Sequence, residues 1–322
     1  MKRRGLRWFN AVMFSGALRS FFACSEDEGT PGKADVDIEI TDASSDDAYI
    51  KSVMVTIAEV KVNGQTLTGF SKQTIDLKAY QEGNTKLLGT TQLDAKSYSN
   101  ITLVLDGDTD ASGNAPGCYV LTQDGGKFKL TNSTSGKMNV VVNQSWKVAS
   151  GVKNKIVIDF DLRKSIRHSD DPAVRYSFVS ESNMSAALRI VARERAGAIK
   201  GTYEDQGSVN AEKIIVYAYK RGTFNASTET SAQTSDNIYF KNAVASAEVK
   251  QSLTGKTYTL AFLEEGDYEL HFVAYSKNAE TGRYSMTARL KSETSADGAV
   301  GDFVKVRAGA TANITANITG II

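Results

Sequence analysis

The sequence predicts an all-β protein of two consecutive β-sandwich domains that follow an N-terminal export segment. Short runs of alternating apolar and polar residues recur along the chain, as half-buried strands require. Clusters of Gly, Asn, Asp and Ser separate these runs, which is typical of turns. No segment of ten or more residues has a clear 3.6-residue period, so we expect no long helix.

Length and composition support this class. The 322 residues are enough for about two domains of roughly 150 residues. The formal net charge of +1 gives no basic footprint for nucleic acid, which we therefore exclude as a partner. No apolar stretch after Cys24 approaches the roughly 20 residues that a membrane-spanning helix needs.

Residues 1–23 have the organisation of a signal peptide. Basic residues come first, and a short apolar region follows. Cys24 stands directly after Ala23, so the region looks like a lipobox, in which the signal is cut before a cysteine that receives a lipid. Arg19 and the bulky pair Phe21–Phe22 fit that pattern less well. The alternatives are an ordinary secretory signal with an unrelated cysteine, or a misplaced start codon.

The first predicted domain covers residues 35–195, after a small, polar tether over residues 24–34. Its first strand places Val36, Ile38 and Ile40 on one face and acids on the other. Residues 85–97 are expected to contain one short helical turn. The predicted strands are 34–41, 50–62, 73–79, 98–105, 118–122, 127–131, 137–148 and 154–162.

The second predicted domain covers residues 196–322. The join around residue 195 is short and lacks proline, so we expect the two domains to abut closely. The predicted strands are 197–203, 213–220, 243–250, 257–263, 267–276, 284–292, 302–308 and 311–322. The pattern does not decide whether the last strand completes its own sheet or pairs with a partner.

Cysteine usage gives no disulfide framework. If Cys24 carries a lipid, Cys118 is left alone and no intrachain disulfide can form. Cys118 alternates with Val120 along a strand, so we expect it to pack inward as a small apolar residue. A reactive thiol is the alternative.

One loop has the composition of a cation site. Asp106, Asp108 and Asp110 stand at alternate positions, as in an oxygen-ligand calcium loop, and Asn114 adds an oxygen. The EF-hand pattern is incomplete, because Ala111 and Gly117 stand where Gly and a bidentate Glu are needed. The alternative is an Asp- and Gly-rich hairpin loop. Calcium at these aspartates is the one cofactor that the sequence suggests.

No constellation for catalysis is visible. Asp159 and Asp161 share a strand face, which we expect to be a solvent face beside Arg163 and Lys164. The histidines His168 and His271 lie in different predicted domains with no cysteine partner, so neither a zinc site nor a triad can be assembled. The nucleophile-elbow, P-loop and dinucleotide motifs are missing from the sequence. We predict that the protein is not an enzyme.

Aromatic side chains are the remaining candidates for ligand contact. Sugar-binding and protein-binding surfaces expose Tyr and Trp, whereas most large aromatics of a sandwich pack in its core. The candidates are Trp146, Tyr217, Tyr219, Phe224, Tyr239, Phe240, Tyr275 and Tyr284.

Residues 35–195 resemble the domain-of-unknown-function 4382 family, which is common in lipoproteins of Bacteroidota. Ser97 departs from the glycine that the family pattern leads us to expect before Tyr98. The family has no established activity, so the resemblance implies architecture and location rather than chemistry. The stretches that carry it are 37–64, 74–80, 97–106, 135–143 and 156–166.

The C-terminal part resembles transthyretin-like or carboxypeptidase-regulatory-like sandwiches, and the immunoglobulin-like class also fits. The likeness rests on residues 197–205, 260–275 and 304–318. Such modules generally act as spacers or adhesive units. In lipoproteins of this phylum, acids directly after the lipidated cysteine act as a surface-export signal, and Ser25 to Glu28 fits that signal.

The sequence therefore predicts a non-catalytic lipoprotein, anchored through Cys24 in the outer membrane and exposed at the cell surface. It would act as a binding or adhesion module, or as a structural part of the envelope, with a protein or glycan ligand that the sequence does not identify. The alternative is a glycan-binding accessory lipoprotein of a nutrient-uptake system.

Overall fold

The computed structural model describes residues 32–43, 49–132, 136–169, 171, 174–207, 209–231, 238–279, 284–296 and 299–322. The predicted signal peptide, Cys24 and most of the tether lie outside these residues. The described part is mostly β-strand, arranged in several sheets, which confirms the all-β class. Within it, no helix is long and apolar enough to cross a membrane.

A four-stranded sheet begins the described N-terminal half, residues 32–195. Its order is β15–β12–β1–β5, with β1 and β12 parallel. Val36, Ile38 and Ile40 point into the core as predicted, and Asp37, Glu39 and Thr41 occupy the opposite face. The strands are β1 (Lys33–Ala43), β5 (Lys86–Asp94), β12 (Asn154–Asp161) and β15 (Leu188–Ala192).

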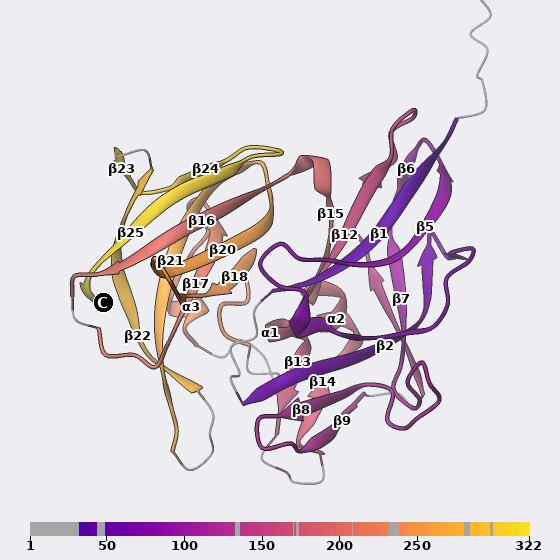
Figure 1. Ribbon diagram of the computed structural model, residues 1–322, viewed down its shortest axis with the longest axis horizontal. Helices are drawn as coiled ribbons and strands as arrows, with labels where there is room; N and C mark the ends of the chain where they lie inside the picture. Colours follow the sequence, from indigo (N-terminus) through magenta and orange to yellow (C-terminus); the bar gives the residue numbers. More distant parts are fainter. Residues whose placement is uncertain are drawn as a thin grey trace, which may run out of the picture.

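A nine-stranded sheet packs against that apolar face. Side chains of β2 and β7 meet those of β1 and β12 in one core, so the half is a sandwich (Figure 1). Its strands are β2 (Ile50–Val62), β3 (Gln65–Thr66), β4 (Gln73–Asp76), β7 (Ile101–Asp106), β8 (Tyr119–Thr122), β9 (Lys127–Thr131), β10 (Lys137–Val142), β13 (Ile166–His168) and β14 (Tyr176–Phe178).

Short elements complete this half. The segment 85–97, where a helical turn was predicted, consists mainly of strand β5 (Lys86–Asp94), which pairs with β1 over almost its whole length. Ser180 caps α2 by accepting a hydrogen bond from Asn183 N at 3.4 Å. These elements are β6 (Ser97–Tyr98), β11 (Trp146–Lys147), α1 (Leu162–Ser165), α2 (Glu181–Ala187) and the 3₁₀ turns η1 (Leu77–Ala79) and η3 (Arg193–Arg195).

The described C-terminal half, residues 196–322, is one ten-stranded sheet that folds over on itself. Tyr203 on one layer packs against Phe272 on the other, with ring centroids 5.8 Å apart. The strands are β16 (Ala196–Asp205), β17 (Lys213–Lys220), β18 (Ala245–Glu248), β19 (Lys250–Ser252), β20 (Gly255–Glu264), β21 (Gly266–Lys277), β22 (Tyr284–Ala296), β23 (Ala299–Gly301), β24 (Val304–Val306) and β25 (Thr311–Ile321).

The last strand completes its own sheet. β25 lies between β16, to which it is parallel, and β22, to which it is antiparallel. Ile314, Ala316 and Ile318 of this strand are buried in the main core of the C-terminal half. The strand is therefore an internal part of the fold.

A second, smaller core lies on the other face of β17 and β21. It contains Ile215, Tyr217, Tyr219, Val273 and Tyr275. The segment that follows β17 covers it, including the short helix α3 (Ala226–Glu229) and Phe240.

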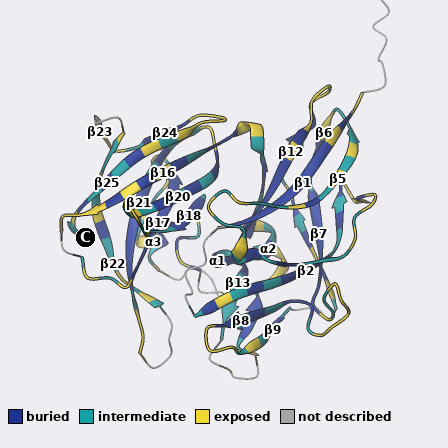
Figure 2. Cartoon of the chain, in the orientation of Figure 1, coloured by how far each residue is buried: buried dark blue, intermediate teal, exposed yellow. Residues whose placement is uncertain are grey.

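The two halves meet through side chains and loops. In the described residues, no strand of the N-terminal half pairs with a strand of the C-terminal half. We call the contact region between the halves the junction (Figures 1 and 2). The domain limits at residues 34/35 and 195/196 stay predictions.

Candidate functional site

The predicted calcium loop uses its first aspartate for internal contacts. Asp106 Oδ2 pairs with Lys72 Nζ at 2.8 Å, and Asp106 Oδ1 accepts from the backbone N–H groups of Asp108 and Thr109. Burial alone would raise the pKa of Asp106, but these hydrogen bonds and the Lys72 charge lower it overall. Asp106 is thus a structural carboxylate of this loop.

Asp108 and Asp110 do not point toward a common site with Asp106, and each has partners of its own. Asp108 faces Lys129 at 3.4 Å, and Asp110 Oδ1 accepts from Ser112 N and Asn114 N. The residues described contain no group of three His, Cys, Asp or Glu side chains placed to hold a metal. Calcium binding at Asp106, Asp108 and Asp110 stays a prediction, without support from their geometry.

Asp159 and Asp161 are buried, so their predicted position on a solvent face is wrong. They share the polar face of β12, as predicted, but the C-terminal half covers that end of the sheet. Asp159 Oδ2 pairs with Arg189 Nη2 at 2.6 Å, and Asp161 Oδ2 pairs with Arg163 Nη2 at 2.8 Å. Asp161 also caps α1. Burial is possible because each acid has a cation beside it.

The cations that pair with these acids extend across the junction. Arg189 Nη1 donates to Phe262 O at 2.7 Å. Arg163 Nη1 donates to Tyr239 O and Phe240 O at 2.7 and 2.8 Å, and Lys164 Nζ donates to Ala243 O at 2.7 Å. No local sequence pattern marks Arg189 or Phe262 as functional residues.

Asp42 lies at the same end of the sheet. Its carboxylate accepts from Leu162 N at 3.2 Å and from Gln81 Nε2 at 2.7 Å. Burial raises the pKa of Asp42 well above its usual value, and the nearby charges of Asp161 and Asp159 add to that rise.

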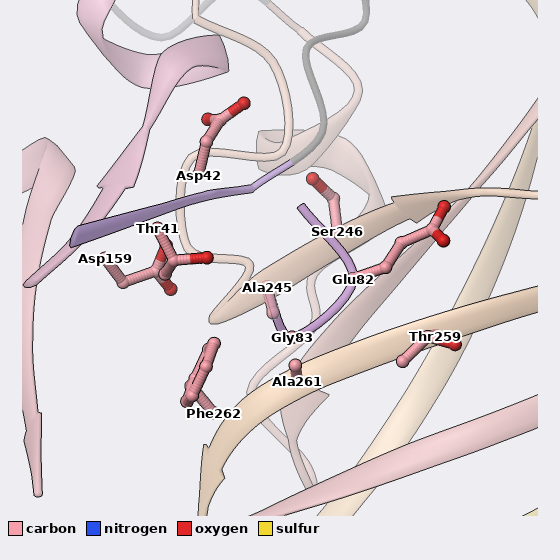
Figure 3. Close-up of a pocket in the computed structure, with 10 residues that line it drawn as sticks. All are labelled: Thr41, Asp42, Glu82, Gly83, Asp159, Ala245, Ser246, Thr259, Ala261 and Phe262. Atoms are coloured by element: carbon pink, nitrogen blue, oxygen red, sulfur yellow. The ribbon is translucent and has the colours of Figure 1, made fainter. Parts of the chain in front are cut away.

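A shallow recess opens at the junction (Figure 3). Asp159 points into it, and Asp159 Oδ1 has no hydrogen-bond partner. The volume of the recess is about 310 Å³ with the open mouth included. The enclosed part of the recess holds only about one water molecule. A recess of this size is not a metabolite site. It is lined by Thr41, Asp42, Glu82, Gly83, Asp159, Ala245, Ser246, Thr259, Ala261 and Phe262.

Most of the aromatic candidates belong to the cores. Tyr217 stacks on Phe240 with ring centroids 4.1 Å apart, and Trp146 stacks on Tyr98 at 4.8 Å. Tyr219 donates its hydroxyl hydrogen to the buried Glu229 at 2.6 Å. Those buried are Trp146, Tyr217, Tyr219, Phe240 and Tyr275, those half-buried are Phe224 and Tyr284, and Tyr239 is exposed. No platform of exposed aromatic rings forms among them.

The histidines and Cys118 have structural positions. His168 packs edge-on against Tyr176, and His271 stacks on Phe224, so each belongs to its own half. Cys118 is buried as predicted, and burial raises the pKa of its thiol to about 12. A thiol in this environment stays protonated and unreactive at neutral pH.

Residues 33–178 match the family described as Domain of unknown function (DUF4382). The N-terminal half therefore carries a domain of this family, and the match ends before the predicted boundary at 195. No curated protein matches the chain.

Solved structures resemble the chain only distantly. A leucine-rich repeat protein from Bacteroides thetaiotaomicron VPI-5482 is 14% identical, with a TM-score of 0.22 over 88% of this chain and 26% of that one. A candidate cell adhesion protein from Bacteroides fragilis NCTC 9343 is 9% identical, with a TM-score of 0.20 over 89% and 93% of the two chains. The major pilin subunit of Bacillus cereus is 9% identical, with a TM-score of 0.21 over 89% and 70%. Scores this low support no conclusion about function.

Proposed function

We propose that the protein is a non-catalytic, lipid-anchored module of the cell surface that serves in binding, adhesion or envelope structure. The observation that carries this proposal is that the clustered aspartates of the protein make structural contacts. Asp106, Asp159 and Asp161 are each engaged in holding a loop or the junction. A module that presents a surface needs a firm scaffold, whereas an enzyme needs reactive groups that converge on an accessible pocket.

The anchor rests on the sequence around Cys24. A cysteine directly after a signal region, followed by acids at Glu26 to Glu28, supports lipidation and export to the outside of the cell. Each buried CH₂ of an acyl chain contributes about 0.8 kcal/mol, so several chains hold a protein firmly at a membrane. Both halves would then stay in water.

Two measurements test the lipid anchor and the exposure of the protein at the cell surface. Mass spectrometry of the mature N-terminus from native envelopes should find an acylated Cys24, and protease treatment of intact cells should remove the protein. A matched Cys24→Ser variant should leave the envelope fraction. An unmodified N-terminus, or a protein untouched by protease, contradicts the proposal.

The adhesive role needs a separate assay. Cells that carry the wild-type protein should adhere to immobilised host or envelope ligands more than cells that carry Cys24→Ser. Equal adherence of the two strains, together with a confirmed anchor, would favour the structural role in the envelope.

A further inference from the structure

Unusual backbone conformations gather at the junction. The part of the chain that the structure describes has four non-glycine residues with positive φ, and three of them lie there: Glu82 (58°), Phe240 (51°) and Phe262 (54°). The fourth, Asn63, forms a tight turn with Gly64, where Asn is common. Bulky residues rarely adopt this conformation, because their Cβ crowds the neighbouring carbonyl oxygen. It persists only where the surroundings hold it.

Each of these three residues carries a bond across the junction. The carbonyl oxygens of Phe240 and Phe262 accept from Arg163 and Arg189 of the N-terminal half. Glu82 of that half pairs with Lys250 of the C-terminal half at 2.5 Å. The unusual backbone and the bonds between the halves therefore coincide.

A β-bulge explains how Phe262 reaches the other half. The pairing of β16 with β20 shifts between Gly197 and Ile199, which pair with Leu263 and Leu260, so Ala261 and Phe262 have no partner in the ladder. Bulges turn a side chain away from its regular direction. The Phe262 ring packs against Val157 and Val191 of the N-terminal half.

Phe240 is held in a matching way. Its ring stacks on Tyr217, and the Arg163 guanidinium lies over the Tyr217 ring, 5.4 Å from its centroid. Next to it, Ile238 is buried in the core of the N-terminal half. The segment 238–243 thus belongs to the C-terminal half in sequence but is fastened to both halves.

We propose that the bonds of Arg163, Arg189 and Glu82 across the junction, which we call the latch, fix the two halves in one orientation. When these bonds break, the backbone at Phe240 and Phe262 relaxes. Arg163 and Arg189 donate from their guanidinium groups to carbonyl oxygens, and the geometry of such bonds is directional. The apolar contacts of the junction are few: one small cluster contains Val157, Val191, Ala196 and Phe262, and Ile238 enters the core of the N-terminal half. The latch therefore determines the direction in which the C-terminal half is presented.

The test measures the distance between the halves with spin labels. The full chain with Cys24→Ser receives labels at Gln92→Cys and Lys291→Cys, two exposed positions in different halves, while Cys118 stays buried. The wild-type junction should give one narrow distance distribution. Arg163→Met and the pair Asp159→Asn/Arg189→Met should each broaden it, and their combination should broaden it most.

The control variant is Arg221→Met. Arg221 stacks on Phe303 within the C-terminal half, 3.9 Å from the ring centroid, so this change should leave the distribution unchanged. A broad distribution in the wild type, or a narrow one in the folded combination, overturns the proposal. If the combination loses its strand signal in circular dichroism, the distance distribution of Arg163→Met alone tests the proposal. This single variant should stay folded, because Asp161 keeps Lys164 as a partner at 3.4 Å.

Discussion

Two acidic segments of this chain are alike in sequence and differ in the structure. Asp106, Asp108 and Asp110 alternate along one segment, and Asp159 and Asp161 alternate along another. The first segment forms a loop in which Asp106 and Asp110 accept hydrogen bonds from the loop's own backbone N–H groups. The second is covered by the other half of the protein and pairs with arginines that cross the junction. The difference shows that an acidic pattern acquires its role from what packs over it.

The largest expected effect is at Asp161. We expect Asp161→Ala to lower the free energy of unfolding by about 3–5 kcal/mol, because it removes the carboxylate that pairs with the buried Arg163 and also removes the cap of α1. Urea unfolding at pH 7 measures it. The matched change in the loop, Asp110→Ala, should cost much less, because it removes only hydrogen bonds from the backbone of its own loop. Equal losses for the two variants would end the contrast between the segments.

The energy of the Asp159–Arg189 ion pair can be measured separately from the contributions of its two side chains. Arg189→Met alone should cost about 3–5 kcal/mol, because Asp159 stays buried and loses its cation. Asp159→Asn/Arg189→Met should cost clearly less, since neither member is then charged. A double-mutant cycle from urea unfolding gives the coupling energy. A double variant as unstable as the single one would show that the carbonyl bond to Phe262, rather than the charge pair, dominates.

The loop carboxylate Asp106 should stabilise the protein at neutral pH. Its pKa is lowered in the folded state, so its stabilisation is present above the unfolded pKa of about 3.9 and is lost as the pH falls through the folded pKa. Asp106→Asn should therefore cost about 1–2 kcal/mol at pH 7 and nearly nothing at pH 2. Unfolding curves between pH 2 and 7 check this, and a pH-independent cost would assign the effect to packing.

The junction carboxylate Asp42 should have the opposite pH dependence. Its pKa is raised in the folded state, so its contribution to stability is fully present below the unfolded pKa and declines as the pH rises toward the folded pKa. Asp42→Asn should therefore become more stable than wild type, by a margin that grows as the pH rises from 4 to 7. Thermal unfolding at several pH values measures it. If Asp42→Asn instead loses stability relative to wild type as the pH rises, the raised pKa of Asp42 is contradicted.

The smallest expected effect is that of calcium. Because Asp106 and Asp110 accept hydrogen bonds from their own loop, millimolar calcium or a chelator should leave the unfolding temperature unchanged. A ligand that binds only the folded state must raise that temperature. A rise that Asp108→Asn abolishes would support calcium binding at this loop.

The strands and the inward faces could be predicted from the sequence, because a two-residue period shows which side chains share a face. Val36, Ile38, Ile40 and Cys118 are buried as that period indicates. Helix α2 was missed, although Ser180 followed by Glu181 is a helix-start signal. Seven residues are too few to show a helical period.

The individual contacts of the junction could not be predicted, because they join residues far apart in sequence. Asp159 looks like a solvent-facing acid until β15 supplies Arg189 and the bulge at Phe262 closes over them. Which of the aromatic candidates are buried could not be predicted for a related reason. A tyrosine such as Tyr217 alternates along its strand like an exposed residue, and only the segment around Phe240 buries it.

The central place of β25 bears on how the protein is made. The C-terminal half cannot close its sheet until residues 311–321 have been synthesised, because β16 and β22 pair with each other only through them. Contacts between β16 and β25 span more than a hundred residues, and such long-range pairing is slow. In an exported chain this delay would keep the C-terminal half unfolded, and so able to pass a narrow translocation channel, until its last strand has emerged.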